Sequence, residues 1–189
     1  SSFWIFDSLF TPQDHPIREM QDTFFLKRNS LIQNKELANR IKLTHENGWT
    51  TGSKGWNYTW KESEAQKSVL RTHTTGLSVR MLSKLKKEDL PAKFFAVGKV
   101  FRNETLDWSH LFEFHQTEGI VIDENVTFKH LLGYLKKFFL KMGYQKVRLR
   151  PAFFAYTSPS CEIDLYKQIH KKWIELGGAG IFRTEITRS

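Results

Sequence analysis

Cysteine is almost missing from this chain of 189 residues: Cys161 is the single one. One cysteine excludes an internal disulfide and a zinc cluster of several cysteines, which fits a reducing compartment. The sequence also has no apolar run near the ~20 residues that a membrane-spanning helix needs. Its first ten residues, SSFWIFDSLF, lack the basic region of a signal peptide. We therefore expect a soluble, cytoplasmic protein.

Acidic residues are outnumbered by basic ones. Twenty Asp and Glu stand against 29 Lys and Arg, so the net charge is +9. Such an excess favours a polyanionic partner, because binding releases condensed counterions; the alternative is a basic surface that binds nothing. Hydrophobic residues make up 40% of the chain and aromatic ones 14%, enough for a folded core. Without a repeat, low-complexity tract or linker, residues 1–189 are expected to form one domain.

The N-terminal third contains two segments with local signals. Residues 15–26 (HPIREMQDTFFL) predict a helical turn running into a strand, because proline is tolerated in a first helical turn. Residues 47–60 (NGWTTGSKGWNYTW) carry three glycines and several turn formers, so they predict a loop. The aromatic side chains of this loop either anchor it on the body of the protein or face a partner.

Two helices are predicted from apolar periodicity. The first spans about residues 75–85, where Leu77, Met81 and Leu85 recur at i, i+4 and i+8. Thr74 or Thr75 could serve as its N-cap. The second spans residues 127–142, with Thr127 as the cap and Gly143 as the terminator. Its apolar face predicts a core role and contains Phe128, Leu131, Leu132, Leu135, Phe138, Phe139 and Met142.

The remaining pattern is that of antiparallel strands. Residues 94–102 and 112–122 predict a hairpin, residues 146–150 and 153–157 two further strands, and residues 171–176 an alternating segment. That last segment opens into the glycine-rich run Gly177-Gly178-Ala179-Gly180. The predicted fold class is α+β, an antiparallel β-sheet flanked by helices.

The hairpin is the most informative feature. Side chains two apart on a strand share a face, so Arg102 and Glu104 should point together on the first strand, and Phe114, Gln116 and Glu118 together on the return strand. One wall then offers a cation for a phosphate, an aromatic plate for a base and polar groups for a small ligand. Taken singly, each residue also fits an ordinary role, such as a solvated ion pair or a core aromatic.

The hairpin signature is Phe-Arg, one residue, Glu, a loop ending in His110, and a Phe on the return strand. It resembles motif 2 of the class II aminoacyl-tRNA synthetases, and the whole chain is similar to the archaeal and eukaryotic phenylalanyl-tRNA synthetase α subunits. This resemblance implies a class II fold and ATP-dependent charging of tRNA(Phe) with phenylalanine, with Mg²⁺. It also implies a β subunit as partner, in a heterotetramer, and no membrane.

The resemblance implies a role for each hairpin residue. Arg102 would bind the α-phosphate and the ligand carboxylate, and His110 the terminal phosphates. Glu104 would accept from the adenine amino group or help to hold a metal ion. Phe114 would stack on the adenine. The catalytic residues by this reading are Arg102 and Glu104.

The resemblance also implies the amino-acid site. Gln116 and Glu118 would receive the ammonium group. His73 and Thr75 lie at the family's entry to the first predicted helix, where such residues touch the amino acid. The segment 153–157 resembles the family's phenyl pocket, with Phe154 and Tyr156 toward the ring. Ala179 resembles the small residue of the pocket floor, and Gly178 beside it would let the backbone approach the ligand.

Two departures from the family pattern matter. The family usually continues with Glu-Pro-Ser after the segment 153–157, whereas this chain has Ser158, so an expected carboxylate is missing. Motifs 1 and 2 are present in residues 1–189, but the Glu-Arg pattern of motif 3 is not, so we expect a partial catalytic domain that is weakly active or inactive alone. The alternative is a synthetase-like protein that binds an amino acid or RNA without catalysis.

Overall fold

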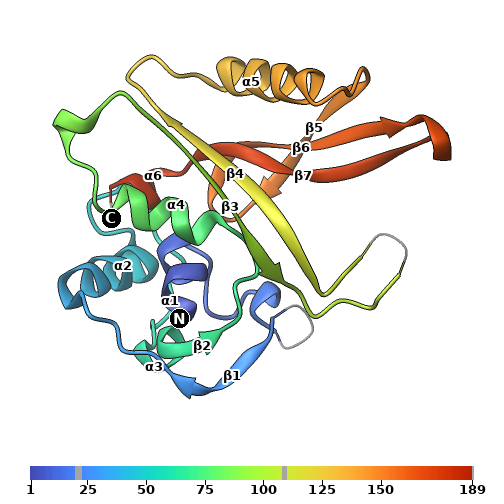
Figure 1. The fold of residues 1–189 in the computed structure, drawn as a ribbon. Helices are drawn as coiled ribbons and strands as arrows, with labels where there is room; N and C mark the ends of the chain where they lie inside the picture. The colour runs from blue at the N-terminus through green and yellow to red at the C-terminus, as the bar shows by residue number, and fades with distance from the viewer. Residues whose placement is uncertain (20–22, 108–109, 189) are drawn as a thin grey trace. The chain divides into compact units, whose positions relative to one another are not determined.

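The computed structural model describes residues 1–19, 23–107 and 110–188. The chain divides into two compact units, one of residues 1–122 with 184–189 and one of residues 123–183. Helices and antiparallel sheets occur in both units (Figure 1), which confirms the predicted α+β class. No helix in the described parts of the chain has both the length and the apolar character needed to cross a membrane.

The first unit contains two two-stranded antiparallel sheets, β1–β2 and β3–β4, surrounded by short helices. Its elements in chain order are α1 (Ser2–Ile5), η1 (Asp7–Leu9), η2 (Pro16–Arg18), β1 (Phe25–Asn29), α2 (Lys35–Asn47), α3 (Glu62–Gln66), β2 (Lys67–Val69), α4 (Thr75–Leu82), η3 (Lys87–Asp89), β3 (Ala92–Phe101), β4 (Glu113–Ile122) and α6 (Thr184–Thr187). The turn η2 and the later strand β1 confirm the predicted turn and strand, with Pro16 in the first turn; residues 20–22 of the predicted segment lie outside the described residues.

Helix α2 supplies much of the core of this unit, although sequence reasoning did not predict it. Its first turn is capped by Asn34, whose side-chain oxygen accepts from the Leu37 N–H at 2.9 Å. Leu37 and Ile41 then face the core. The whole core cluster consists of Phe3, Ile32, Leu37, Ala38, Ile41, Trp60 and Ala65.

The segment after α2 is a loop, as predicted, and aromatic side chains anchor it. Trp60 Nε1 donates to the Asp7 carboxylate at 2.8 Å. Trp56 Nε1 donates to the Phe10 carbonyl at 2.8 Å, and the Tyr58 hydroxyl is hydrogen-bonded to His45. Of the four aromatic residues of this loop, which are Trp49, Trp56, Tyr58 and Trp60, only Trp49, 38% exposed, departs from the anchoring interpretation.

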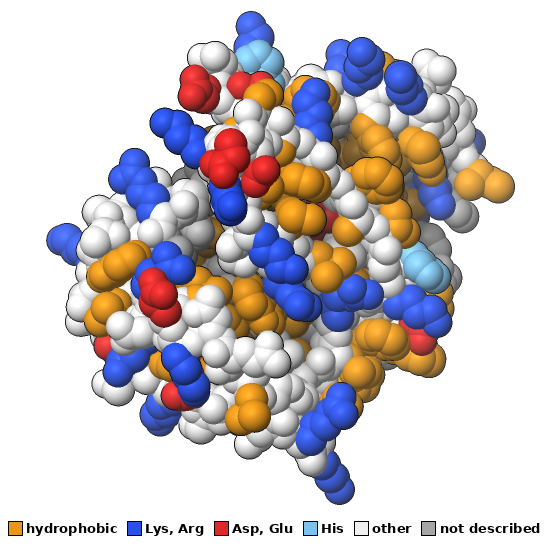
Figure 2. Space-filling model, turned by 60° about the vertical axis from the view of Figure 1, so that its left-hand side comes forward, with side chains coloured by type: hydrophobic (Ala, Val, Ile, Leu, Met, Phe, Trp, Pro, Cys, Tyr) orange, Lys and Arg blue, Asp and Glu red, His pale blue; other side chains and the backbone are white. Residues whose placement is uncertain are grey.

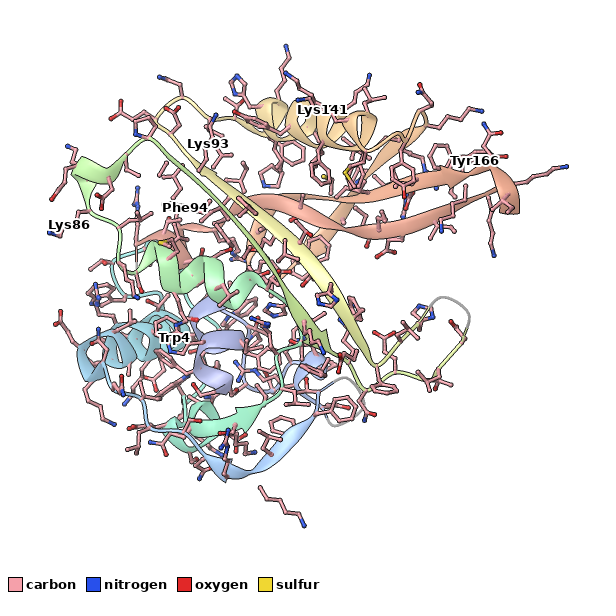
Figure 3. All side chains as sticks on the ribbon, viewed as in Figure 1. Trp4, Lys86, Lys93, Phe94, Lys141 and Tyr166 are labelled. Atoms are coloured by element: carbon pink, nitrogen blue, oxygen red, sulfur yellow. The ribbon has the colours of Figure 1, made fainter. Side chains whose placement is uncertain are left out.

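Helix α4 confirms the first predicted helix but not its buried face. The residues buried on α4 are Thr75, Gly76, Ser78 and Val79, whereas Met81 of the predicted apolar stripe is 38% exposed. The reason is close packing on α1, where Figure 3 labels Trp4. A Cβ on Gly76 would lie 2.8 Å from the Trp4 carbonyl oxygen, so only small side chains fit this face.

Strands β3 and β4 form the predicted hairpin. Their antiparallel register pairs Val100 with Phe114, Gly98 with Gln116 and Ala96 with Glu118. This register places the three predicted β4 residues at alternate positions of one strand, as expected. In Figure 1 the hairpin runs past α4, with which both strands are in contact.

The second unit is one helix on a three-stranded antiparallel sheet of order β5-β6-β7. Its elements are α5 (Phe128–Lys141), β5 (Val147–Phe154), β6 (Thr157–Lys167), η4 (Gln168–His170) and β7 (Lys172–Phe182). The strand predicted over residues 146–150 lies within β5. However, β5 runs unbroken through Pro151 to Phe154 and Thr157 already begins β6, so the separate strand predicted over residues 153–157 is wrong. Strand β6 was not predicted, and β7 continues through the glycine-rich run.

Helix α5 matches its predicted bounds and caps but not its predicted core role. Thr127 and His130 form its capping box, and Gly143 follows with φ +91°. No residue of α5 is buried, and Phe138 is 48% exposed. Within its unit α5 packs on β5 and β7. A single helix on a three-stranded sheet covers its apolar stripe only on the side that faces the sheet.

Candidate functional site

Glu118 lies in a socket of hydroxyl groups from the start of α4. Its Oε2 accepts from Thr75 Oγ1 at 2.7 Å and from Thr74 Oγ1 at 3.1 Å, and its Oε1 accepts from Ser78 Oγ. Among the described residues no Lys, Arg or His forms an ion pair with this carboxylate. The hydroxyls orient the negative charge but do not neutralise it, so the socket suits a cationic group.

Gln116 is bound to the same turn. Its side-chain oxygen accepts from the Thr74 N–H at 2.8 Å and from the Thr74 hydroxyl at 3.3 Å. Thr74 is the N-cap residue of α4, as predicted, but its side chain makes no cap bond. Its hydroxyl instead forms hydrogen bonds with Gln116 and Glu118 of β4. Gln116 and Glu118 therefore lie on one face and contact one turn, as the alternation predicted.

His73 lies just before this turn and is buried, with 8% of its surface exposed. Its ring packs edge-on against Phe6 at 6.3 Å between centroids. Burial, and then the positive charge of Arg102, lower the pKa of His73 to about 4, while a backbone hydrogen bond at Ile5 opposes the shift. The imidazole is therefore neutral at pH 7. Its predicted contact with an amino acid stays a prediction.

Arg102 lies one residue beyond β3, which ends at Phe101. The prediction that Arg102 and Glu104 share a strand is therefore wrong, although Arg102 Nη1 does lie 3.8 Å from Glu104 Oε1. The Arg102 guanidinium stands over the Phe114 ring at 5.2 Å, and its Nε donates to the Thr72 carbonyl at 3.3 Å. Its side chain stays 39% exposed. A cation is thus held over an aromatic plate.

His110 belongs to a small turn of its own. Its Nδ1 lies 2.8 Å from the Asp107 carboxylate, and its N–H donates to the same carboxylate at 2.8 Å. The hydrogen bond with Asp107 raises the pKa of His110. The side chain is 54% exposed. Residues 108–109 of the same loop lie outside the described residues.

Phe154 and Tyr156 lie in the second unit. Phe154 ends β5 and Tyr156 lies in the turn to β6, so they do not share one strand as predicted. Their rings are nevertheless stacked, 6.0 Å apart at 24°. A Cβ on Gly178 would lie 2.3 Å from Phe154 Cζ, so the ring lies directly on the β7 backbone. Ala179 follows, paired with Cys161 on β6.

Sequence reasoning missed Thr74, Ser78 and Arg71. Thr74, Thr75 and Ser78 at i, i+1 and i+4 are a hydroxyl cluster on one side of a helix start, a signal that could have been found. Arg71 Nε donates to the Lys99 carbonyl at 2.8 Å, and a Cβ on Gly98 would lie 2.7 Å from Arg71 Nη2. No local pattern predicts that packing, because Gly98 lies far along the chain.

The predicted residues thus divide between the two units. In the first unit Arg102 contacts both Phe114 and Glu104. Gln116, Glu118 and Thr75 meet at the start of α4, which His73 precedes, and His110 lies in its own turn. The second unit contains Phe154, Tyr156, Gly178 and Ala179. No cluster of three or more His, Cys, Asp or Glu that could hold a metal ion occurs in the described residues.

Comparison with known proteins decides the family. The family model for the class II core domain of tRNA synthetases (F) matches residues 1–189. The chain belongs to the class II tRNA synthetase core family. This confirms the family that the sequence predicted. Glu118 lies on the β3–β4 hairpin and Arg102 directly follows β3, so both belong to the segment whose pattern predicted this family.

Curated relatives of this chain include proteins named phenylalanine–tRNA ligase α subunit. The chain is 52% identical over 188 residues to that of Methanopyrus kandleri, covering 98% of this chain and 36% of the relative. It is 50% identical to those of Dictyostelium discoideum and Rattus norvegicus, each over 98% of this chain and 39% and 37% of the relative. This class II core domain spans between one third and two fifths of the length of these relatives.

Proposed function

We propose that this chain is part of the catalytic core of a phenylalanine–tRNA ligase α subunit, which activates phenylalanine with ATP and transfers it to tRNA(Phe). The observation that carries the proposal is the Glu118 socket, an oriented anion without a cation partner among the described residues, on the motif 2 hairpin. Residues 1–189 then supply motifs 1 and 2 of one partial catalytic domain. The names of the relatives support the substrate assignment.

The proposed reaction needs no protein nucleophile. A carboxylate oxygen of phenylalanine attacks the α-phosphorus of ATP, and the bond to the bridging oxygen breaks so that pyrophosphate leaves with its electron pair. The protein then contributes positioning and stabilisation of negative charge. Arg102 suits this role because its guanidinium is always charged and offers a rigid fork of donors. Its exposed side chain leaves that fork open to solvent.

The residues around Arg102 fit the other parts of ATP. Phe114 would offer the aromatic plate for the adenine, and His110 would contact the terminal phosphates. The hydrogen bond with Asp107 raises the pKa of His110, which favours the charged ring that suits a phosphate. Mg²⁺ in nucleotide sites uses one or two carboxylates together with substrate phosphates. Glu104 is the candidate carboxylate, and Mg²⁺ would neutralise phosphate charge there. The absence of a larger ligand cluster from the described residues fits that mode.

The amino acid is assigned to the remaining residues. Glu118 and Gln116 would receive the ammonium group. Thr75 would orient the carboxylate of Glu118, and His73 would line the site as a neutral ring. Phe154 and Tyr156 would contact the phenyl ring, where an aromatic pair adds about 0.5–1.5 kcal/mol. Gly178 and Ala179 would keep the floor flat. The proposed partners are tRNA(Phe) and a β subunit, which the name α subunit presupposes, in the cytoplasm.

Phenylalanine-dependent exchange of pyrophosphate into ATP tests this proposal. The chain is assayed alone and with a β subunit from one of the relatives, and with tyrosine and leucine as control amino acids. We expect exchange with phenylalanine alone among the three, and more of it with the β subunit. Binding of phenylalanine without any exchange under both conditions would favour the second candidate, a synthetase-like binding protein.

A further inference from the structure

Arg71 has no role in the proposed function, although its side chain reaches the face of the hairpin that carries Gln116. Lys and Arg side chains are common on this protein, and Figure 2 shows them in several separate places of the face that it draws. A further arginine is therefore informative only where its surroundings are arranged for a ligand. The contacts of Arg71 meet that condition.

The backbone and the side chain of Arg71 are both fixed on β3. The Phe101 N–H donates to the Arg71 carbonyl at 2.7 Å, and Arg71 Nε donates to the Lys99 carbonyl at 2.8 Å. These two bonds hold the stem of the side chain and leave the terminal nitrogens Nη1 and Nη2 beyond it. Arg71 is half-buried. A side chain that is already held in place loses little further freedom when a ligand binds.

A missing side chain at Gly98 brings the guanidinium of Arg71 to the hairpin face. A Cβ on Gly98 would lie 2.7 Å from Nη2 and 3.1 Å from Cζ of Arg71. The guanidinium therefore occupies the place that a side chain of residue 98 would take. Gly98 is paired with Gln116, and paired residues of antiparallel strands share a face with their Cβ atoms about 4.5–5.5 Å apart. The charge of Arg71 thus lies next to Gln116.

The donors at this position have no acceptor within the part of the chain that the structure describes. No described Asp or Glu forms an ion pair with Arg71, whose one hydrogen bond to a described residue uses Nε. The oxygen of Gln116 accepts from Thr74, but its amide nitrogen donates to no described residue. A guanidinium and an amide nitrogen that both still need acceptors suit an anion.

The order of the groups along the hairpin indicates which anion this is. Arg102 stands over Phe114. Gln116 and the Arg71 guanidinium lie two residues further along β4, and Glu118 follows after another two. Positions two apart on a strand are separated by about 7 Å. A receptor for an anion therefore lies beside the receptor for a cation. An α-amino acid carries its ammonium and carboxylate groups on one carbon, so it can bind to both at once.

We propose that Arg71 is a specificity-determining residue that binds the carboxylate of the amino-acid substrate, together with the amide nitrogen of Gln116. The planar fork of a guanidinium matches the two oxygens of a carboxylate. The oxygen of Gln116 stays on the side of the ammonium group, and Arg102 serves the α-phosphate. The proposal rests on the proposed function for the amino acid. It deepens that function by naming the group that distinguishes an amino acid from an amine.

The test compares L-phenylalanine with L-phenylalaninol, which keeps the ring and the ammonium group but has a neutral CH2OH group in place of the carboxylate. Calorimetry gives the Kd of each ligand. Arg71→Ala should weaken phenylalanine binding about tenfold or more and change phenylalaninol binding by less than about twofold. A residue that only stabilised the fold would weaken both ligands alike. Arg28→Ala, at an exposed position of β1, is the control and should change neither Kd.

Two further variants keep the test decisive. Gly98→Ala retains the charge but displaces the guanidinium, so it should also reduce the preference for phenylalanine over phenylalaninol. Arg71→Lys should recover part of that preference, because it keeps the charge and loses only the fork. Equal weakening of both ligands in Arg71→Ala, or a preference that only Arg102→Ala abolishes, would overturn the proposal. So would a wild-type chain that binds both ligands equally. Pyrophosphate exchange plays no part in this test, so its failure would count against the proposed function alone.

Discussion

Thr75, in the first turn of α4, donates its hydroxyl proton to Glu118 of β4 across 2.7 Å. The contact joins residues 43 positions apart and binds the start of a helix to the face of a strand. Thr74 and Ser78 complete the shell of donors, so the carboxylate is oriented before any ligand arrives. Preorganised charge of this kind stabilises a ligand without the cost of rearranging the protein.

Removing the charge of Glu118 should weaken the binding of phenylalanine. Glu118→Gln keeps the size of the side chain and one acceptor oxygen but removes the negative charge that an ammonium group needs. A hydrogen bond to a charged group contributes about 2 kcal/mol, so we expect a roughly 30-fold rise in the KM for phenylalanine in pyrophosphate exchange. The KM for ATP should change much less.

The matched control is Glu113→Gln on the same strand. Glu113 forms an exposed ion pair with Lys99 at 2.5 Å, and such surface pairs contribute little. Its substitution should leave the KM for phenylalanine within about twofold of the wild type. The same rise in both variants would mean that Glu118 is not the ammonium receptor.

Features with local signals were predicted well. The hairpin of β3 and β4 follows from alternation, and α5 follows from its cap, its apolar stripe and the glycine that ends it. Helix α2 was missed, although Asn34 and the buried Leu37 and Ile41 carry the same kind of signal. Helix α2 could therefore have been predicted from the sequence. The exposed face of α5 was a different error, since periodicity identifies an apolar stripe but not what covers it.

Contacts between distant segments could not be predicted. Thr74 has the residue type and position of an N-cap, yet its hydroxyl contacts β4, because Gln116 and Glu118 lie next to it in the fold. The buried face of α4 follows from the carbonyl of Trp4 against Gly76, which no periodicity encodes. Phe154 and Gly178 touch because β5 and β7 share a sheet with β6 between them.

Arg102 and Phe114 should contribute to ATP binding as a pair. The guanidinium stands over the ring at 5.2 Å, so each side chain helps to position the other. Arg102→Ala and Phe114→Ala should each weaken ATP binding, and the double variant should lose less than the sum of the two. Arg102→Lys should not restore binding, because lysine lacks the planar fork.

Calorimetric titration with ATP measures this cycle. Lys99→Ala serves as the control, because it removes a cation of β3 that forms only a surface ion pair. ATP affinity of Arg102→Ala equal to that of the wild type would end the phosphate assignment. Strict additivity of the two losses would separate the roles of Arg102 and Phe114.

Gly178 should act as a positioning residue for the Phe154 ring. A Cβ at residue 178 would lie 2.3 Å from Phe154 Cζ and 2.5 Å from Cε2, so Gly178→Ala must displace the ring. We expect weaker phenylalanine binding by calorimetry, with partial recovery when Phe154→Leu is added to make room.

Gly133→Ala in α5 is the control, because nothing lies within 4 Å of its added Cβ. It should gain about 0.5–1 kcal/mol of stability from helix propensity. Unchanged phenylalanine binding in Gly178→Ala would show that the position of the Phe154 ring does not matter for binding.

His73 should make the protein less stable in acid. Burial lowers its pKa to about 4 in the folded state, whereas the ordinary value of 6.5 applies to the unfolded chain. Above pH 6.5 the imidazole is neutral in both states and costs nothing. As the pH falls from 6.5 to 4, the unfolded chain binds the proton first, so the free energy of unfolding drops by about 3 kcal/mol in total.

Urea unfolding between pH 4 and 7.5 measures this drop. His73→Gln should flatten it, apart from the share of His45, whose pKa burial also lowers. His110→Gln, at an exposed position with a raised pKa, should leave this loss in place. A wild-type stability that stays constant down to pH 4 would mean that His73 is not held neutral by the fold.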